Sequence, residues 1–243
     1  MDARQAADSR PWYHTLELAP GVVTDGWFDL REDVKHYGLP DDLTGKRVLD
    51  VGTWDGFWAF EFERRGAEVV ALDLDDERQL DWPPRRRPPE SEMRDDQRGA
   101  GFHLAHEVKQ SKVQRVVKSI YFATPEEYGQ FDIVFCGSVL IHLRDQLLAL
   151  ERIRNLVKPG GTFISAEEYD KRGALLPWRS ARFLANRDAA VVFWMPTVKT
   201  WQAMHYTAGF DTTTVHGKFD MHAGRGKDRF TVPHVVLHST YGG

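Results

Sequence analysis

A short run in the first third of the chain has the composition of a nucleoside-binding loop. Residues 48–57 read VLDVGTWDGF, so an apolar strand leads through two glycines into a helix. Glycine lets the backbone turn tightly and approach a ligand without a Cβ in the way, and the amides at a helix start attract negative groups. Asp73 ends the next apolar run, where a carboxylate can accept hydrogen bonds from both ribose hydroxyls. The pattern predicts a nucleoside cofactor.

Trp54, which lies between Gly52 and Gly56, indicates which nucleoside cofactor fits. A dinucleotide needs Gly-x-Gly-x-x-Gly so that pyrophosphate can lie on bare backbone, and here the second glycine position holds Trp54. Asp50 opens the loop instead, where its carboxylate can organise the loop and face the ammonium of a methionine moiety. The cofactor-binding residues predicted here are Asp50, Gly52, Thr53, Trp54, Gly56, Asp73 and Leu74. A strand–turn–helix without a ligand is the alternative.

Two residues that follow later apolar runs are the predicted catalytic residues. His142 comes after the run 131–135, and the ordinary pKa of a histidine suits a base near neutral pH. Glu167 directly follows the run 162–166 and is placed to bind or deprotonate a substrate. The alternatives are a histidine that holds a loop by hydrogen bonds, and a glutamate in a solvated turn beside Glu168.

The elements that must position these residues alternate between strand and helix from Lys46 onward, which indicates a parallel sheet with crossover helices. We predict strands at 47–51, 68–72, 113–120, 131–135 and 162–166, and helices at 54–65, 101–110 and 147–157. Thr197 caps a further helix that Gly209 ends. The runs 210–216 and 230–238 are expected to form a closing antiparallel pair.

The domain division follows from the same pattern. We expect an N-terminal lid at 1–45 and a single compact domain at 46–243. The segment 81–101 begins with closely spaced prolines, which exclude a regular element there, so it is expected to be an exposed insertion. Within it, the arginines at 85–87 are followed by acidic residues and indicate a solvated, self-neutralised loop rather than a nucleic-acid patch.

The composition restricts the class of protein further. The 243 residues are 42% hydrophobic, enough for a sizeable core, and their formal net charge of -4 weighs against a protein coated in nucleic acid. The single cysteine excludes an intramolecular disulfide, and the histidines lack ligand spacing, so no metal is predicted. Residues 1–10 have no apolar signal region, and no stretch reaches the roughly 18 apolar residues that span a bilayer. We therefore expect a cytoplasmic protein without a membrane partner.

Several motifs resemble those of the class I S-adenosylmethionine-dependent methyltransferases. They are residues 50–56 (DVGTWDG), Asp73, residues 131–140 (FDIVFCGSVL) and residues 156–161 (LVKPGG). The segments 12–18 (WYHTLEL) and 21–26 (GVVTDG) are similar to the branch that includes the bacterial tRNA wobble-uridine carboxymethyltransferases. The resemblance covers residues 12–238, nearly the whole chain.

The resemblance implies a Rossmann-like α/β fold. Its seven-stranded mixed sheet is mostly parallel, with an antiparallel C-terminal strand and helices on both faces. S-adenosylmethionine is expected across the first four strands, with Asp50, Gly52 and Gly56 on the methionine side and Asp73 at the ribose. The residues implied at the adenine and the floor of the site are Ser119, Ile120, Tyr121, Gly137 and Ser138. Trp12, Tyr13 and His14 are expected to form a lid, with packing against the sheet edge as the alternative.

Three positions depart from the members of this branch that use a carboxylated cofactor. Those members hold the extra carboxylate with a lysine, a tyrosine and an arginine, where this chain has His14, Ile141 and His234. Isoleucine cannot donate a hydrogen bond, and an anionic group needs donors or a fixed positive charge to replace its water. The departures predict ordinary S-adenosylmethionine and methyl transfer.

The predicted function is methylation of an oxygen or nitrogen atom of a small molecule. The acidic charge balance and the aromatic-rich lid segments favour it. A first alternative is methylation of a tRNA base, which requires a basic face formed by Arg172, Arg179, Arg182 and Arg187. A second is a non-catalytic nucleoside-binding protein, for which Trp54 in the glycine loop is the motivation. An exposed strand edge is compatible with a homodimer.

Overall fold

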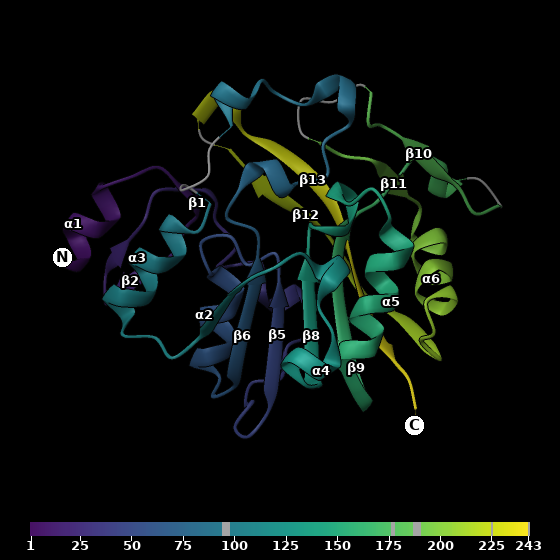
Figure 1. Ribbon diagram of the computed structural model, residues 1–243, viewed down its shortest axis with the longest axis horizontal. Helices are drawn as coiled ribbons and strands as arrows, with labels where there is room; N and C mark the ends of the chain where they lie inside the picture. Colours follow the sequence, from purple (N-terminus) through teal and green to yellow (C-terminus); the bar gives the residue numbers. More distant parts are fainter. Residues whose placement is uncertain (94–97, 176–177, 187–190, 225, 243) are drawn as a thin grey trace.

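A seven-stranded sheet forms the centre of the protein (Figure 1). The computed structural model describes residues 1–93, 98–175, 178–186, 191–224 and 226–242. In spatial order the strands are β12 (Thr212–Ala223), β13 (Phe230–Thr240), β9 (Val157–Glu168), β8 (Phe131–Gly137), β5 (Arg47–Val51), β6 (Glu68–Asp73) and β7 (Gln114–Val117). The pairs from β9 to β7 are parallel, and β13 is antiparallel to both of its neighbours. The predicted fold class is confirmed.

Helices cover both faces of this sheet. Successive side chains of a strand point to opposite faces, and β5 illustrates the consequence: Val48 packs with α2 (Phe57–Arg64) and α3 (Ala100–Lys109), whereas Leu49 packs with α5 (Gln146–Leu156) and α6 (Val198–Thr207). The sheet is therefore buried on both sides, with its largest enclosed side chains split between the two layers. Two short helices, α1 (Ala3–Asp8) and α4 (Pro125–Tyr128), complete the α-helices of the described residues.

Most predicted elements lie close to where the sequence placed them. The strand predicted at 113–120 is the shorter β7, the strand predicted at 162–166 is part of the longer β9, and one helix starts later than predicted for a physical reason. The helices predicted at 101–110 and 147–157 are α3 and α5, and the Thr197 side chain caps α6 by accepting the Thr200 amide. The helix predicted from 54 begins only at Phe57. Trp54 and Gly56 have φ angles of 47° and 93°, which lie outside the right-handed helical region, so the loop is longer than predicted.

The N-terminal segment contains short strands that the sequence pattern did not predict. β1 (Trp12–His14) pairs in parallel with β4 (Gly26–Phe28), and β2 (Glu17–Ala19) pairs with β3 (Val22–Val23) in antiparallel fashion. A Cβ on Gly26 would lie 2.0 Å from the carbonyl carbon of His14, so only glycine allows this approach. Trp12 and Leu16 pack into the same cluster as α2 and α3, which fixes the segment against the domain.

Two connections above the carboxyl ends of the strands complete the fold. Between β9 and α6, β10 (Ala181–Phe183) and β11 (Trp194–Pro196) form an antiparallel hairpin. The Pro-rich segment after β6 contains two 3-10 turns, at Pro84–Arg86 and Glu90–Glu92, and most of its side chains from 84 to 92 are exposed. Of the insertion predicted at 81–101, residues 94–97 lie outside the described residues, and α3 begins at Ala100. Across the described ranges, the longest helices fall short of the length and apolarity that a membrane crossing requires.

Candidate active site

A cavity of about 560 Å³ opens at the carboxyl ends of β5, β6 and β8 and continues to β13. Open α/β sheets bind ligands at this edge, and the volume lies within the range of small-molecule sites. One end is lined by Gly52, Trp54, Asp73, Leu74, Ser119, Ile120 and Tyr121. Toward β12 and β13 the cavity is lined by Met221, Phe230 and His234, and the remaining wall includes Tyr13, His14, Phe28 and Tyr37 of the N-terminal segment and Trp58 of α2.

The loop after β5 holds its shape through Gly52 and Trp54. Gly52 has a φ of 79°, and a Cβ there would lie 2.3 Å from the Val139 side chain, so glycine is required. The Gly52 amide donates to the Leu72 carbonyl oxygen over 2.7 Å. The Trp54 amide donates to Asp73 Oδ2 over 2.8 Å, which ties the loop to the end of β6.

Asp73 has the surroundings of a ribose-binding carboxylate. Its two oxygens accept one amide each, from Trp54 and from Leu74 (2.7 Å). Each carboxylate oxygen can accept further hydrogen bonds, so the group keeps capacity for the two hydroxyls of a ribose. Arg98 Nη2 lies 3.6 Å from Asp73 Oδ1 and balances its charge.

Trp54 is held between two other side chains. The Tyr13 ring stacks on it with centroids 4.3 Å apart, and the Arg98 guanidinium lies 4.0 Å from its ring centroid. Stacking and cation–π contacts each contribute about 1 kcal/mol. The Trp54 indole therefore contacts both Tyr13 of the N-terminal segment and Arg98 at the expected cofactor end of the cavity.

The expected adenine end is built from a turn and the start of the Pro-rich segment. Ile120 and Tyr121 lie in a 3-10 turn (Ile120–Phe122) after β7. The Tyr121 hydroxyl donates to Asp81 Oδ2 over 2.6 Å and accepts the Asp145 amide over 3.0 Å. Trp82 also lines the cavity and donates its ring N–H to the Glu77 carbonyl oxygen. The rigid turn and the apolar Ile120 side chain suit a flat base.

Asp50 lies beneath the loop rather than at the cavity surface. It is 1% exposed, Oδ2 has no hydrogen-bond partner, and burial raises the pKa of its carboxyl to about 7. The Thr53 side chain is also buried, and its proximity opposes the rise in the pKa of the Asp50 carboxyl. Neither side chain lines the cavity, so both lie within the loop.

The opposite end of the cavity is aromatic and contains two neutral histidines. Burial lowers the pKa of His14 to about 3 and that of His234 to about 4. His14, Ile141 and His234, the three positions aligned with the carboxylate-binding residues of the carboxymethyltransferases, all line this cavity. None of the three carries a positive charge at neutral pH.

His142 lies in the cavity wall with one ring nitrogen engaged. It ends the 3-10 turn Leu140–His142, and Nδ1 is 2.5 Å from the Val191 carbonyl oxygen. Because a carbonyl oxygen only accepts, Nδ1 carries the hydrogen and Nε2 has the free lone pair. Burial lowers the pKa of His142, so the ring is neutral at physiological pH.

Glu167 is enclosed, and its neighbour faces the cavity. Glu167 Oε1 accepts the amides of Val139 (3.2 Å) and Leu140 (3.1 Å), so it holds the turn that follows β8. It is 1% exposed, and burial raises the pKa of its carboxyl to about 8. Glu168 lines the cavity instead. Successive side chains of β9 point to opposite faces of the sheet, so Glu167 lies under the turn and Glu168 faces the cavity.

The structure brings together eight of the predicted site residues at one cavity: Gly52, Trp54, Asp73, Leu74, Ile120, Tyr121, Gly137 and His142. Five others do not line it: Trp12, Asp50, Thr53, Gly56 and Glu167. Trp12 is 3% exposed and donates its ring N–H to the Ala7 carbonyl oxygen, so its side chain packs inside the N-terminal segment. Its neighbours Tyr13 and His14 line the cavity instead. A Cβ on Gly56 would collide with the rings of Phe60 and Phe102, so this glycine serves packing.

Sequence reasoning missed Arg98, Tyr37 and Phe230 as lining residues. Arg98 follows the Pro-rich segment, and Tyr37 and Phe230 lie in stretches without a motif. One signal could have indicated Arg98: an acidic group at a strand end commonly has a basic partner, and Asp73 is such a group.

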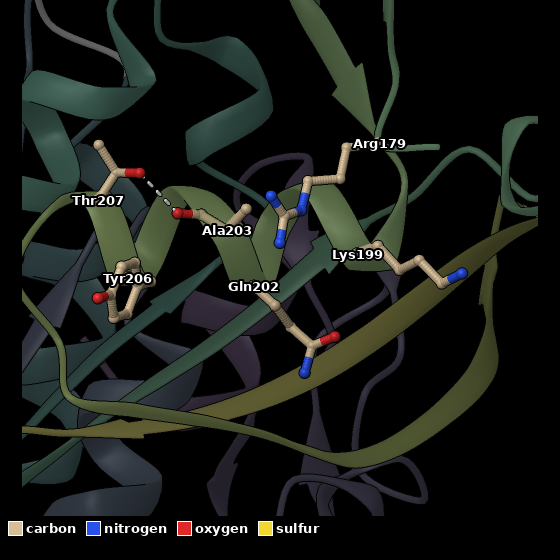
Figure 2. A pocket seen from close by; sticks show the side chains of 6 residues that line it. All are labelled: Arg179, Lys199, Gln202, Ala203, Tyr206 and Thr207. Carbon is tan, nitrogen blue, oxygen red and sulfur yellow. Dashed lines mark hydrogen bonds between the residues drawn. The ribbon is translucent and has the colours of Figure 1, made fainter. Parts of the chain in front are cut away.

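A second hollow lies on the outer face of α6, where Arg179 and Lys199 flank Gln202 (Figure 2). Its volume is about 550 Å³ and its remaining lining residues are Ala203, Tyr206 and Thr207. The Gln202 amide donates to the Thr213 carbonyl oxygen, and Thr207 donates to that of Ala203. The hollow contains none of the strand-end residues, so the chemistry belongs to the larger cavity.

The strand-end carboxylate, the glycine loop and the order of the sheet define the chain as a nucleoside-binding α/β protein of the methyltransferase type. The family described as "Methyltransferase domain" matches residues 28–215, more than half of the chain. The chain belongs to this family. This membership agrees with the predicted methyltransferase class.

Curated relatives are similar over part of the chain. The ubiquinone biosynthesis O-methyltransferase of Xanthomonas campestris pv. campestris is 34% identical over 120 residues, 49% of this chain and 42% of the relative. The corresponding protein of Vibrio cholerae serotype O1 is 34% identical over 148 residues, 56% of this chain and 52% of the relative. The chain thus spans about half the length of the curated relatives it matches.

Solved structures share the fold at low sequence identity. The N-terminal domain of EvdMO1 with bound SAH has a TM-score of 0.63 at 16% identity, covering 98% of this chain and 95% of that one. The Burkholderia thailandensis 1,6-didemethyltoxoflavin-N1-methyltransferase, with bound 1,6-didemethyltoxoflavin and S-adenosylhomocysteine, has a TM-score of 0.52 at 17% identity, covering 81% and 72%. These similarities support the Rossmann-like fold. The finer assignment to the tRNA wobble-uridine branch is not confirmed by them.

Proposed function

We propose that this chain transfers a methyl group from S-adenosylmethionine to an oxygen or nitrogen atom of a small molecule. The observation that carries the proposal is the single cavity with two unlike ends. Asp73, Gly52 and Ile120 provide one end with the groups that suit ribose, a methionine moiety and adenine. Aromatic side chains and neutral histidines line the other end, which suits a flat or apolar acceptor.

Ordinary S-adenosylmethionine fits the cavity better than a carboxylated cofactor. His14 and His234 are neutral and Ile141 cannot donate a hydrogen bond, so these positions offer no positive charge to an additional carboxylate. When bound, S-adenosylmethionine supplies a methyl group on a positively charged sulfur. The aromatic rings that surround the acceptor end favour a cation nearby.

The residues of the chain have separate roles in this proposal. The lid formed by residues 1–45 positions the acceptor through Tyr13, His14 and Tyr37, all of which line the cavity. Excluding water and fixing the acceptor in line with the methyl group is a large part of catalysis. Glu167 positions the turn after β8, and His142 stays a candidate base through its free Nε2. The cytoplasmic location and a homodimer stay predictions.

Calorimetric titration tests the cofactor first. The purified, cofactor-stripped protein is titrated with S-adenosylmethionine, with S-adenosylhomocysteine and with NAD. Micromolar binding of the first two without binding of NAD is expected, and no binding of either would exclude the proposed function. Transfer of radiolabelled methyl groups to a panel of catechols, phenols, anilines and bulk tRNA then identifies the acceptor class.

Methylation of a tRNA base is the second candidate. Arg172, Arg179 and Arg182 are exposed around the β10–β11 hairpin, and Lys199 lies beside Arg179 (Figure 2). Arg187, the fourth predicted member of this basic face, lies outside the described residues. Binding through phosphate contacts must weaken steeply with salt. A tRNA affinity that is undetectable, or that does not change between 50 and 200 mM salt, argues against this candidate.

A further inference from the structure

A serine and a histidine that are 96 residues apart meet in the wall of the cavity. Ser138 Oγ lies 2.7 Å from His234 Nε2, and His234 Nδ1 lies 3.1 Å from the Val232 carbonyl oxygen. A carbonyl oxygen only accepts, so Nδ1 carries the hydrogen and Nε2 presents a lone pair. Ser138 must therefore donate its hydroxyl hydrogen to the histidine, which leaves both serine lone pairs for another donor.

The backbone of Ser138 is held in an unusual conformation to make this contact. Its φ is 55°, in the left-handed region that residues other than glycine rarely adopt. The Ser138 amide donates to the Ala166 carbonyl oxygen, and the next two amides donate to the buried Glu167 carboxylate. Strained residues that their surroundings hold in place cluster at functional sites. This strain indicates a role for the side chain of Ser138.

The position of the pair within the sheet places it between the two ends of the cavity. Ser138 follows β8, the strand that lies between β5 on the nucleoside side and β9 on the acceptor side. His234 lies opposite Glu168 in the β13–β9 register, and both line the cavity.

We propose that Ser138 and His234 form a proton relay for a hydroxyl acceptor, which makes the chain an O-methyltransferase. This inference rests on the proposed function. The acceptor oxygen forms a bond to the methyl carbon as the carbon–sulfur bond breaks, and the electron pair of that bond stays on sulfur. The acceptor proton passes to Ser138 Oγ, while the proton of Ser138 passes to His234 Nε2. The resulting imidazolium later releases its proton to water.

The charge balance of the site suits this step. The transfer removes the positive charge from sulfur and leaves one positive charge, on the histidine, so the net charge of the cavity is unchanged. Asp220 on β12, which also forms an ion pair with Lys171, favours an imidazolium, and Glu168 on β9 lies opposite His234 in the strand register. The Phe219 ring, 5.8 Å away, covers its other side. Burial keeps the histidine neutral before the reaction, with its pKa at about 4.

The test uses Ser138→Ala and His234→Gln, with His222→Gln as the matched control. His222 is an exposed histidine on β12 that does not line the cavity. His142→Gln tests the rival base. Titration with S-adenosylhomocysteine comes first, and all four variants are expected to bind it within about threefold of the unchanged protein, which shows that each variant is folded.

Two acceptor probes of different acidity separate a proton relay from a structural role. With catechol, a relay contributes about 10²- to 10⁴-fold to the rate, so Ser138→Ala and His234→Gln are expected to lose at least about a hundredfold in kcat. With 4-nitrocatechol, which is largely ionised at pH 8, the same variants are expected to recover most of the rate. Equal losses with both probes, or losses in His142→Gln alone, overturn the relay.

A measurement that requires no methyl transfer tests the inference without a known acceptor. Nitrogen–proton correlation spectra of the histidine rings report which nitrogen carries the hydrogen. His234 is expected to be the Nδ1–H tautomer, and its Nε2 signal is expected to move in Ser138→Ala. An Nε2–H tautomer overturns the relay whether or not an acceptor has been found. Failure of the unchanged protein to bind S-adenosylmethionine is a different result, and it excludes the proposed function instead.

Discussion

Asp55 Oδ2 accepts hydrogen bonds from the backbone amides of Tyr13, at 2.6 Å, and His14, at 3.2 Å. The carboxylate belongs to the loop after β5, and the two amides belong to β1. One buried side chain therefore connects the loop expected to hold the cofactor with the lid expected to hold the acceptor.

Asp55→Ala is expected to lower the free energy of unfolding by about 3 kcal/mol, because two buried amides lose a charged acceptor. Urea unfolding measures the loss. Limited trypsin digestion is expected to become faster at Arg31 and Lys35, since β1 no longer holds the segment. Asp55→Asn is the control, because its amide oxygen can still accept one amide, and it should lose about half as much. Unchanged midpoints in both variants contradict the connection.

Asp73→Ala is expected to weaken binding of S-adenosylhomocysteine by about 1–3 kcal/mol, because the ribose hydroxyls lose their acceptor. This corresponds to a Kd about fivefold to 150-fold higher by calorimetry. Glu68→Gln is the matched control, since Glu68 is an exposed acid at the opposite end of the same strand. An equal Kd in the two variants would remove Asp73 from the ribose site.

Trp54→Gly tests whether the indole supports the cofactor end or obstructs it. The substitution relieves the left-handed backbone but removes the ring on which Tyr13 and Arg98 lie. We expect the Kd for S-adenosylhomocysteine to rise about tenfold, corresponding to the loss of about 1–2 kcal/mol of stacking and cation–π contact. Trp54→Phe keeps an aromatic ring and should stay closer to the unchanged protein. Tighter binding by the glycine variant means that the indole obstructs the site.

Glu167→Gln is expected to change how stability depends on pH. Burial raises the pKa of Glu167 from its ordinary 4.5 to about 8, so the folded protein keeps a proton that the unfolded chain releases in this window. The folded state then binds more protons, and the free energy of unfolding falls as pH rises from 4.5 to 8, by at most about 1.4 kcal/mol per pH unit from this group. The glutamine variant lacks this slope.

Urea unfolding at pH 5, 7 and 9 measures the difference between the two proteins. Glutamine keeps an oxygen that can accept the Val139 and Leu140 amides, so the turn is preserved. The variant should gain stability relative to the unchanged protein as pH rises. Parallel pH curves would show that Glu167 is ionised in the folded protein over the whole range.

The sheet was predictable because its signals are local and repeated. In β5, alternate residues such as Val48 and Leu49 must face opposite layers, and the position of Asp73 at a strand end follows from the same periodicity. The Thr197 cap was equally local. The strands of the lid were not predictable, because elements of two or three residues are too short to show a period.

The errors in the predicted site have a different cause. Glu167 and Glu168 are chemically alike, so the sequence does not indicate which of them a strand turns toward the cavity. Trp54 in a left-handed conformation contradicts local preference, and its contacts with Asp73, Tyr13 and Arg98, all distant in sequence, hold it there. The Ser138–His234 contact depends on the register of β13 against β9, which no local pattern specifies.

The Asp55 connection also has a thermodynamic consequence. If a bound acceptor presses on Tyr13 and His14, it acts through two hydrogen bonds on the loop that carries Gly52 and Trp54. Coupling between two binding events is reciprocal, so whatever factor the acceptor applies to the affinity for the cofactor, the cofactor applies to the affinity for the acceptor. The size of that shared factor then depends on one aspartate that does not line the cavity.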